Sequence, residues 1–435
     1  MLFDNRVPSI ISDLYVTTDI RIFYCINNVV FCRSRGMERN TENPSTTLFR
    51  EYVRIPSVHP DPDYEEVVSF LVKQADSAGL DWRRYELSPG KPILVISWLG
   101  LEPSLPSVLL NSHMDVVPVF PEHWTHPPFS AHKDEAGNIY GRGTQDMKCI
   151  GIMHLEAVKR LKCQGTRPKR TVHITFVPDE EIDGEFGMLG FAKTQYFKDL
   201  NVGFSMDEGM ASPDDEIPLY YGERNCFWIQ VTCLGSPGHG SRFIENTAAE
   251  KAQHVINRLL DYRAKEKARL ESNPELTPGD VTTVNLTLMS GGVQVNVVPD
   301  KYVLNFDIRI TPTTDIVEFE AMLRAWLSEA GTDVSLEFIV DKYTDQSLTS
   351  IKDTDSWFSG LKRAFEKHNL MVKPQIFAAN TDARYLREQG IATFGFSPMP
   401  KTPILLHDHD EFLNEAVLLK GIDIFIDIVN NVANC

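Results

Sequence analysis

Residues 108–115, VLLNSHMD, contain the pattern that decides the fold of this chain. The aliphatic side chains that open segment 108–111 favour a buried strand, and the polar residues His113 and Asp115 follow it directly. Residues 172–181, VHITFVPDEE, have the same form, because an expected strand at 172–177 precedes two consecutive glutamates. In α/β proteins, functional side chains gather where parallel strands end. We therefore expect a sheet whose carboxyl edge carries the chemistry.

Helices and strands alternate on both sides of these two segments. The helices are expected at 47–53, 64–78 and 146–161, and further strands at 92–98 and 204–207. Strands that alternate with helices predict a mostly parallel sheet with helices on both faces, which is an α/β fold. Residues 1–43 precede this pattern and are expected to form a disordered N-terminal extension.

The pattern changes near residue 221, where a different arrangement begins. Its expected elements are strand 227–234, helix 247–270, strands 281–288 and 302–310, helix 317–330 and strand 334–340. The order strand, helix, strand, strand, helix, strand is that of a ferredoxin-like α+β domain. We therefore expect an inserted domain at 222–342 and a catalytic domain formed by 44–221 and 343–435.

The composition excludes several classes of protein. Lys and Arg number 43 against 60 Asp and Glu, a net charge of −17, whereas nucleic-acid binding needs clustered basic residues. The apolar stretch 20–31 is interrupted by polar residues and is too short to cross a bilayer, so no membrane partner is expected. Seven cysteines, odd in number and scattered, are typical of reduced thiols and predict a cytoplasmic protein.

Residues that can bind a metal follow several of the expected strands and turns. They are His113, Asp115, Asp146, Glu180, Glu181, Asp207, Glu208, His407 and His409. Each one alone is explained more simply as a hydrogen-bonded polar group, a solvated surface residue or, for Asp146, a helix cap. Carboxylates that converge on one edge of a sheet, however, repel each other unless a cation holds them. Histidines and carboxylates without a thiolate favour zinc.

Six motifs carry a resemblance to a known family. They are NSHMD at 111–115, GRGTQDMK at 141–148, PDEE at 178–181, MDEG at 206–209, PGH at 237–239 and LHDHDE at 406–411. In this order they resemble the zinc aminoacylase and carboxypeptidase family of metallopeptidases, and its aminoacylase members in particular, over residues 44–432. The resemblance implies hydrolysis of N-acyl-L-amino acids to a carboxylate and a free L-amino acid. The alternative is a dipeptidase or carboxypeptidase with the same metal chemistry.

The resemblance also implies two zinc ions per subunit. Asp146 would bridge both ions. His113 and Glu208 would complete one site, and Glu181 and His407 would complete the other.

Two of these assignments rest on the resemblance alone. Spacing leaves His409 open in place of His407, and Asp207 open in place of Glu208. A non-catalytic binding protein on the same fold would lack a ligand or the catalytic base, and every expected position is filled here.

The same resemblance assigns three catalytic roles. Glu180 would act as the general base, taking a proton from a zinc-bound water and returning it to the departing amine. Asp115 would hydrogen-bond the imidazole of the ligand two residues before it and fix its tautomer. His239 would donate to the developing oxyanion.

Substrate binding and assembly complete the expectations. Asn296 and Arg309 match positions that contact substrate in the family, although Arg309 fits a structural ion pair equally well. Arg384 is expected to bind the substrate α-carboxylate. The inserted domain would serve as a lid and as the interface of a homodimer, carrying His239 towards the metals of the partner subunit.

Overall fold

The computed structural model describes residues 22–26, 29–33, 42–339 and 347–435. The disorder expected for residues 1–43 concerns a segment of which 1–21, 27–28 and 34–41 lie outside the described residues. Within that segment, β1 (Ile22–Ile26) and β2 (Val29–Arg33) pair antiparallel. The expected return to the first domain at residue 343 also lies outside the described residues.

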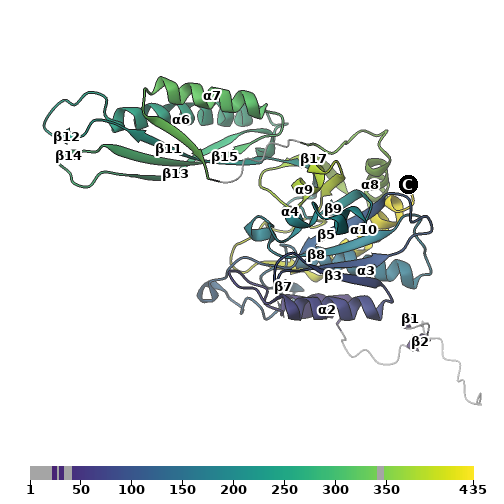
Figure 1. The fold of residues 1–435 in the computed structure, drawn as a ribbon. Coiled ribbons are helices and arrows are strands. Elements are labelled where there is room, and N and C mark those ends of the chain that lie inside the picture. Colours follow the sequence, from purple (N-terminus) through teal and green to yellow (C-terminus); the bar gives the residue numbers. More distant parts are fainter. Residues whose placement is uncertain (1–21, 27–28, 34–41, 340–346) are drawn as a thin grey trace, which may run out of the picture.

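The main body is built on an eight-stranded sheet with the order β17-β10-β18-β9-β5-β8-β4-β3 (Figure 1). Its central neighbours β18, β9, β5 and β8 run parallel, which confirms the mostly parallel α/β sheet. The strands are β3 (Asp81–Glu86), β4 (Pro92–Trp98), β5 (Ser107–His113), β8 (Val172–Val177), β9 (Val202–Asp207), β10 (Glu216–Glu223), β17 (Met371–Phe377) and β18 (Ala392–Gly395).

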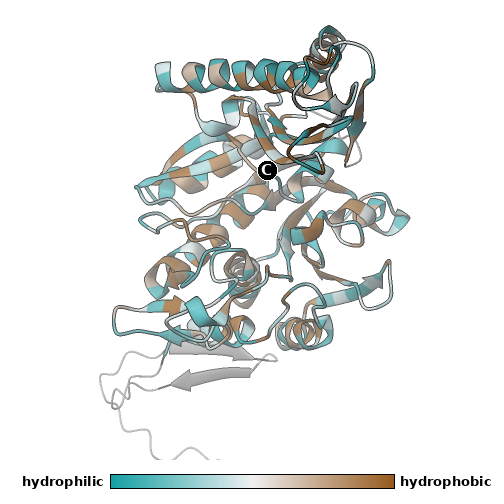
Figure 2. Ribbon diagram, turned by 90° about the vertical axis from the view of Figure 1, so that its left-hand side faces the viewer, coloured by the Kyte–Doolittle hydropathy of each residue, from teal (hydrophilic) through white to brown (hydrophobic). Residues whose placement is uncertain are grey.

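Helices cover both faces of this sheet because successive strand residues point to opposite sides. Leu94 and Leu110 belong to the core under five helices: α1 (Pro44–Val53), α2 (Tyr64–Ser77), α3 (Lys148–Cys163), α8 (Ser356–Lys367) and α10 (Glu415–Val432). Their neighbours Val95 and Leu109 belong to a core on the other face, under α4 (Met188–Phe191), α5 (Gln195–Lys198) and α9 (Ala383–Glu388). Figure 2 shows hydrophobic segments turned towards the sheets and hydrophilic ones on the outer surface.

A second, four-stranded sheet has the order β13-β15-β11-β16, and all of its pairings are antiparallel. Two helices lie on one of its faces and enclose a separate core (Figure 1). The elements are β11 (Asn225–Leu234), α6 (Ala248–Ser272), β13 (Thr283–Gly291), β15 (Lys301–Ile310), α7 (Ile316–Glu329) and β16 (Val334–Phe338). The ferredoxin-like order is therefore confirmed. The chain passes from one sheet to the other at Arg224, between β10 and β11.

Two small sheets matter for the site. β12 (Gly238–His239) pairs with β14 (Val297–Val298) at the end of the second body that points away from the first (Figure 1). β19 (Phe412–Asn414) pairs with β7 (Asn138–Tyr140), which also pairs with β6 (His132–Lys133). The sheet formed by β19, β7 and β6 holds the loop before β19 beside the loop after β7.

The start of α3 differs from the expectation. The helix begins at Lys148, and its N-cap residue, Met147, makes no side-chain capping bond. Asp146 therefore does not cap the helix, and its carboxylate is directed elsewhere. Among the residues that the structure describes, no helix is long and apolar enough to cross a membrane.

Candidate metal centre

The carboxyl edge of the large sheet brings together side chains from five chain segments. His113 is the last residue of β5, Glu181 lies in the 3-10 turn Glu180–Ile182 after β8, and Glu208 follows β9. Asp146 precedes α3, and His407 lies in the loop before β19. We call these five residues the ligand cluster. All but His407 have largely buried side chains.

Asp146 lies at the centre of the ligand cluster. Its Oδ1 is 3.0 Å from His113 Nε2, which in turn is 3.5 Å from Glu208 Oε1. Its Oδ2 is 3.2 Å from His407 Nε2, which is 3.1 Å from Glu181 Oε2. The two carboxylate oxygens of one residue therefore face two separate histidine–glutamate pairs.

Acidic groups outnumber basic ones in the ligand cluster, because three carboxylates share it with two imidazoles. Burial raises the pKa of Glu181 and Glu208, and the charge of Asp146 raises both further. Hydrogen bonds to Asp146 and Glu181 raise the pKa of His407 to about 10. Burial alone would lower the pKa of His113, but the surrounding carboxylates outweigh burial and raise it. Carboxylates crowded together in a buried place raise one another's pKa and also raise the pKa of nearby imidazoles, so a cation placed among them would be stabilised.

A divalent cation with a preference for nitrogen and oxygen donors fits this donor set. Ligand atoms of His113, Asp146 and Glu181 lie within 4.8 Å of one another, as do those of His113, Glu180 and Glu208. These two groups differ from the two histidine–glutamate pairs that the shortest contacts define. We assign the ligands by the shortest contacts, because a bound ion lies among its nearest donors. The buried thiol of Cys149 donates to the carbonyl oxygen of Gln145 instead. Two imidazoles with three carboxylates suit zinc.

The tautomer of His113 is fixed by a main-chain group. Its Nδ1 lies 2.9 Å from the carbonyl oxygen of Asp115 and 3.5 Å from the Asp115 carboxylate. Because a carbonyl oxygen only accepts, Nδ1 carries a hydrogen, which leaves Nε2 as the ring nitrogen that could bind a metal. The Asp115 carboxylate, which the resemblance implied in this role, faces the same Nδ1 beside the carbonyl oxygen.

The Asp115 carboxylate holds the turn that carries both glutamates. It accepts hydrogen bonds from the main-chain N–H groups of Glu180, at 3.2 Å, and Glu181, at 3.1 Å. Its Oδ2 also lies 2.8 Å from His59 Nε2. Burial would raise the pKa of Asp115, but its hydrogen bonds with His113 and His59 hold it below the usual range. Sequence reasoning missed His59, because a single histidine followed by proline carries no recognisable signal.

Asp179 gives this turn its direction. Its φ of 63° lies in the left-handed region, which lets the chain leave the line of β8 and point the two glutamates differently. Its Oδ1 accepts from the Tyr64 hydroxyl at 2.8 Å and from Lys91 Nζ at 2.7 Å. Sequence reasoning missed these two partners as well, since both contacts cross long stretches of chain.

The geometry distinguishes the alternatives that spacing left open. His407 touches Asp146, whereas the His409 ring faces His123 at 5.0 Å between ring centroids. Asp207 accepts from the N–H of Glu208 and from Asn111, so its oxygens serve local hydrogen bonds. His407 is therefore the better placed of its pair, and Glu208 of the other.

Two expected site residues lie far from the ligand cluster. His239 forms part of β12, at the outer end of the second body (Figure 1), and its side chain is exposed. Its Nδ1 lies 2.8 Å from the Ser241 hydroxyl. Asn296 is also exposed, and its carbonyl accepts from the N–H of Gly240, so it lies beside the same loop.

The two expected substrate arginines lie nearer to the main body. Arg309 pairs with Asp307 at 2.8 Å, as a structural ion pair would, and also donates to the Asn380 side chain at 2.7 Å. Arg384 lies in the first turn of α9 and is 3.2 Å from Asp183, next to the turn that carries the glutamates. Of the two arginines, Arg384 is therefore closer to the catalytic edge.

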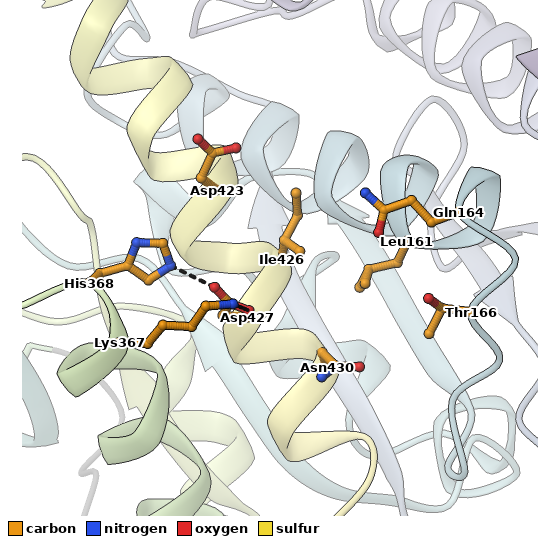
Figure 3. A pocket seen from close by; sticks show the side chains of 9 residues that line it. All are labelled: Leu161, Gln164, Thr166, Lys367, His368, Asp423, Ile426, Asp427 and Asn430. Atoms are coloured by element: carbon orange, nitrogen blue, oxygen red, sulfur yellow. Dashed lines mark hydrogen bonds and ion pairs between the residues drawn. The ribbon is translucent and has the colours of Figure 1, made fainter. Parts of the chain in front are cut away.

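One pocket of the surface lies elsewhere on the molecule. It measures about 570 Å³, and α10 and the ends of α3 and α8 contribute to its lining (Figure 3). In it, Asp427 accepts from Lys367 at 2.7 Å and lies 2.7 Å from His368 Nε2. None of its lining residues was expected in the site from the sequence.

Comparison with known proteins agrees with this geometry. The family model described as Peptidase family M20/M25/M40 matches residues 109–431. Aminoacylase-1 of Sus scrofa is 50% identical over 396 residues, which cover 91% of this chain and 97% of that protein. Aminoacylase-1 of Homo sapiens is 48% identical over 401 residues, which cover 92% and 98%. The solved structure of the Bacillus subtilis YXEP protein, described as a dinuclear metal binding peptidase from the M20 family, has a TM-score of 0.64 at 15% identity and covers 89% and 98%.

The fold and the donor set define a hydrolase of the metallopeptidase class. The chain belongs to peptidase family M20/M25/M40. The family resemblance that the six motifs indicated, including that to its aminoacylase members, is thereby confirmed.

The ligand assignment at residue 407 can be tested against its neighbour. We expect His407→Ala to bind one zinc ion fewer per subunit than the unchanged protein, because His407 is the only imidazole on its side of Asp146 in the described structure. His409→Ala serves as the matched control and should keep full zinc content, measured by elemental analysis of dialysed protein. Loss of zinc from the control alone would reverse the assignment.

Proposed function

We propose that this protein hydrolyses the amide bond of N-acyl-L-amino acids at a pair of zinc ions, releasing a carboxylate and a free L-amino acid. The arrangement of Asp146, with one oxygen towards each histidine–glutamate pair, carries the proposal of two metals. The substrate class is supported by 50% identity to a relative named aminoacylase-1 across 97% of its length.

The ligand cluster would divide between the two ions. Asp146 would bridge them, His113 and Glu208 would bind one, and Glu181 and His407 would bind the other. Zinc bound there would supply Lewis acidity, polarising the substrate carbonyl and making a water molecule more acidic.

Glu180 is the proposed general base. Burial raises its pKa, and the neighbouring carboxylates of Glu208, Asp382 and Glu181 raise it further. A glutamate whose pKa is raised holds a proton more readily than an ordinary one, which suits a group that takes a proton from the attacking water and returns it to the amine nitrogen. Asp115 positions this base by holding the main-chain N–H of Glu180.

Arg384 is proposed to orient the substrate. Its guanidinium is largely buried and lies beside Asp183, in the segment that carries Glu180. A bidentate pair with the α-carboxylate would place the scissile amide between Arg384 and the metals. Asn296 and Arg309 would contact substrate once the inserted domain reaches the site.

The position of His239 supports a homodimer. In its own subunit it lies at the outer end of the inserted domain, and nearby loops carry the almost fully exposed apolar side chains of Phe243, Val293 and Val295. Exposed apolar side chains that cluster on a surface mark an interface. Pairing through the inserted domain would cover them and bring His239 to the partner's metals, where its imidazole would donate to the oxyanion.

The cytoplasm is the proposed compartment. The cysteines are scattered and odd in number, and Cys149 and Cys233 are buried thiols outside any disulfide. Such thiols are typical of proteins in a reducing environment.

The substrate class is tested with a panel of N-acetyl-L-amino acids and dipeptides. We expect turnover of the acetylated compounds, loss of that turnover after dialysis against a strong chelator, and recovery on adding Zn²⁺. Initial rates measured by amine release decide the outcome. Cleavage of dipeptides alone would favour the peptidase alternative, and full activity in verified metal-free protein would refute the mechanism.

The roles of the two adjacent glutamates are tested by matched amide variants. Glu180→Gln should lower kcat by roughly a hundredfold to ten-thousandfold and keep its zinc, because it removes the base and no ligand. Glu181→Gln should lose zinc. Kinetics and elemental analysis of both proteins check this, and the opposite pattern of zinc loss would mean that the two roles are exchanged.

The role of His239 in the partner's site is tested by mixing two inactive variants. His239→Ala and Glu180→Ala are unfolded and refolded together. About half of the randomly assorted dimers are mixed, and each mixed dimer has one site with both residues intact, so about a quarter of the original activity should return. No recovery, with subunit exchange demonstrated, would show that His239 acts in its own subunit or not at all.

A further inference from the structure

Glu411 is a fully buried carboxylate that lies next to the ligand cluster without belonging to it. It directly precedes β19 and is 0% exposed. Its Oε2 accepts from Arg142 Nη1 at 2.7 Å and from the Gly143 N–H at 3.1 Å. Its Oε1 accepts from the N–H groups of Gln145, at 2.6 Å, and Asp146, at 3.3 Å.

Successive main-chain N–H groups that converge on one anion form a strong binding concavity for it. Both oxygens of Glu411 are occupied in this concavity, and neither of the two groups of closely spaced ligand atoms includes Glu411. The carboxylate therefore serves the chain around Asp146 rather than a metal.

A second set of contacts joins the same two loops. Gln145 donates from Nε2 to the carbonyl oxygens of Pro403, at 3.0 Å, and Phe412, at 2.9 Å. Its Oε1 accepts from the N–H of Leu405 at 3.1 Å. The loop at 141–146 and the loop at 403–411 are thus held together, and each of them carries one member of the ligand cluster.

We propose that Glu411 is a positioning residue that sets the orientation of Asp146, and through the joined loops that of His407, for metal binding. The proposal rests on the metal site proposed above. The N–H of Asp146 is bonded to Glu411, while the two oxygens of Asp146 face His113 and His407. Rotation of this residue would change its distance to both histidines at once.

This role needs two acceptor oxygens at residue 411. Glutamine at position 411 would have the same shape but only one acceptor oxygen. Its NH₂ group would therefore face at least two of the N–H groups that now donate to Glu411. The loop would have to move to relieve that contact, and Asp146 would move with it. Residues that orient metal ligands in this way typically contribute about 10- to 100-fold to metal affinity.

The test is a titration of chelator-treated protein with Co²⁺, followed by the visible absorption of the bound ion. We expect Glu411→Gln to bind Co²⁺ about 10- to 100-fold more weakly than the unchanged protein, with an altered absorption band. Glu156→Gln is the matched control. Glu156 is a largely buried carboxylate of α3 that accepts from Ser45 at 2.6 Å, and its partners belong to neither loop. This control should bind Co²⁺ as the unchanged protein does.

The outcomes separate this proposal from the proposed function. Absence of Co²⁺ binding in the unchanged protein would refute the metal site and this role with it. Binding by the unchanged protein together with equal affinity and an equal spectrum in folded Glu411→Gln would refute the positioning role alone. If Glu411→Gln does not fold, Glu411→Asp, which keeps the charge but is one methylene shorter, is titrated instead. Weakened binding would then support the role, and unchanged binding would overturn it.

Discussion

The shared carboxylate of Asp146 is the interaction on which the rest of the site depends. One oxygen faces His113 and the other faces His407, so a single side chain connects two halves of the ligand cluster. Four acidic residues, including the neighbouring Glu180, are crowded at this edge with only two imidazoles. Such crowding is stable only with added positive charge, either as protons or as metal ions. The charge balance therefore favours a bound metal ion, and the donor types suit one.

Two further carboxylates fix the geometry without being ligands. Asp115 holds the N–H groups of the turn after β8, and Glu411 holds those of the loop before α3. The parallel strands supply only the approximate position of each ligand, at their carboxyl ends. The final orientation is set by these anions, which bind main-chain N–H groups where no water competes.

The sequence predicted the strand ends and the inserted domain, because both depend on local periodicity. The strand β8 and the ferredoxin-like order agree with the structure. The helix expected from residue 146 begins at Lys148, so the simpler alternative of Asp146 as a helix cap does not apply. The contact of His59 with Asp115 spans 56 residues, and local pattern cannot reveal such pairs. The exposed position of His239 likewise depends on how the inserted domain projects from the main body, which no local sequence pattern specifies.

Asp146 is proposed to bridge two zinc ions. Crystals of the zinc-loaded protein, measured on both sides of the zinc absorption edge, test this most directly. We expect two anomalous peaks per subunit, about 3.5–4 Å apart, with one Asp146 oxygen bonded to each. A single peak, or two peaks that do not share Asp146, would contradict it.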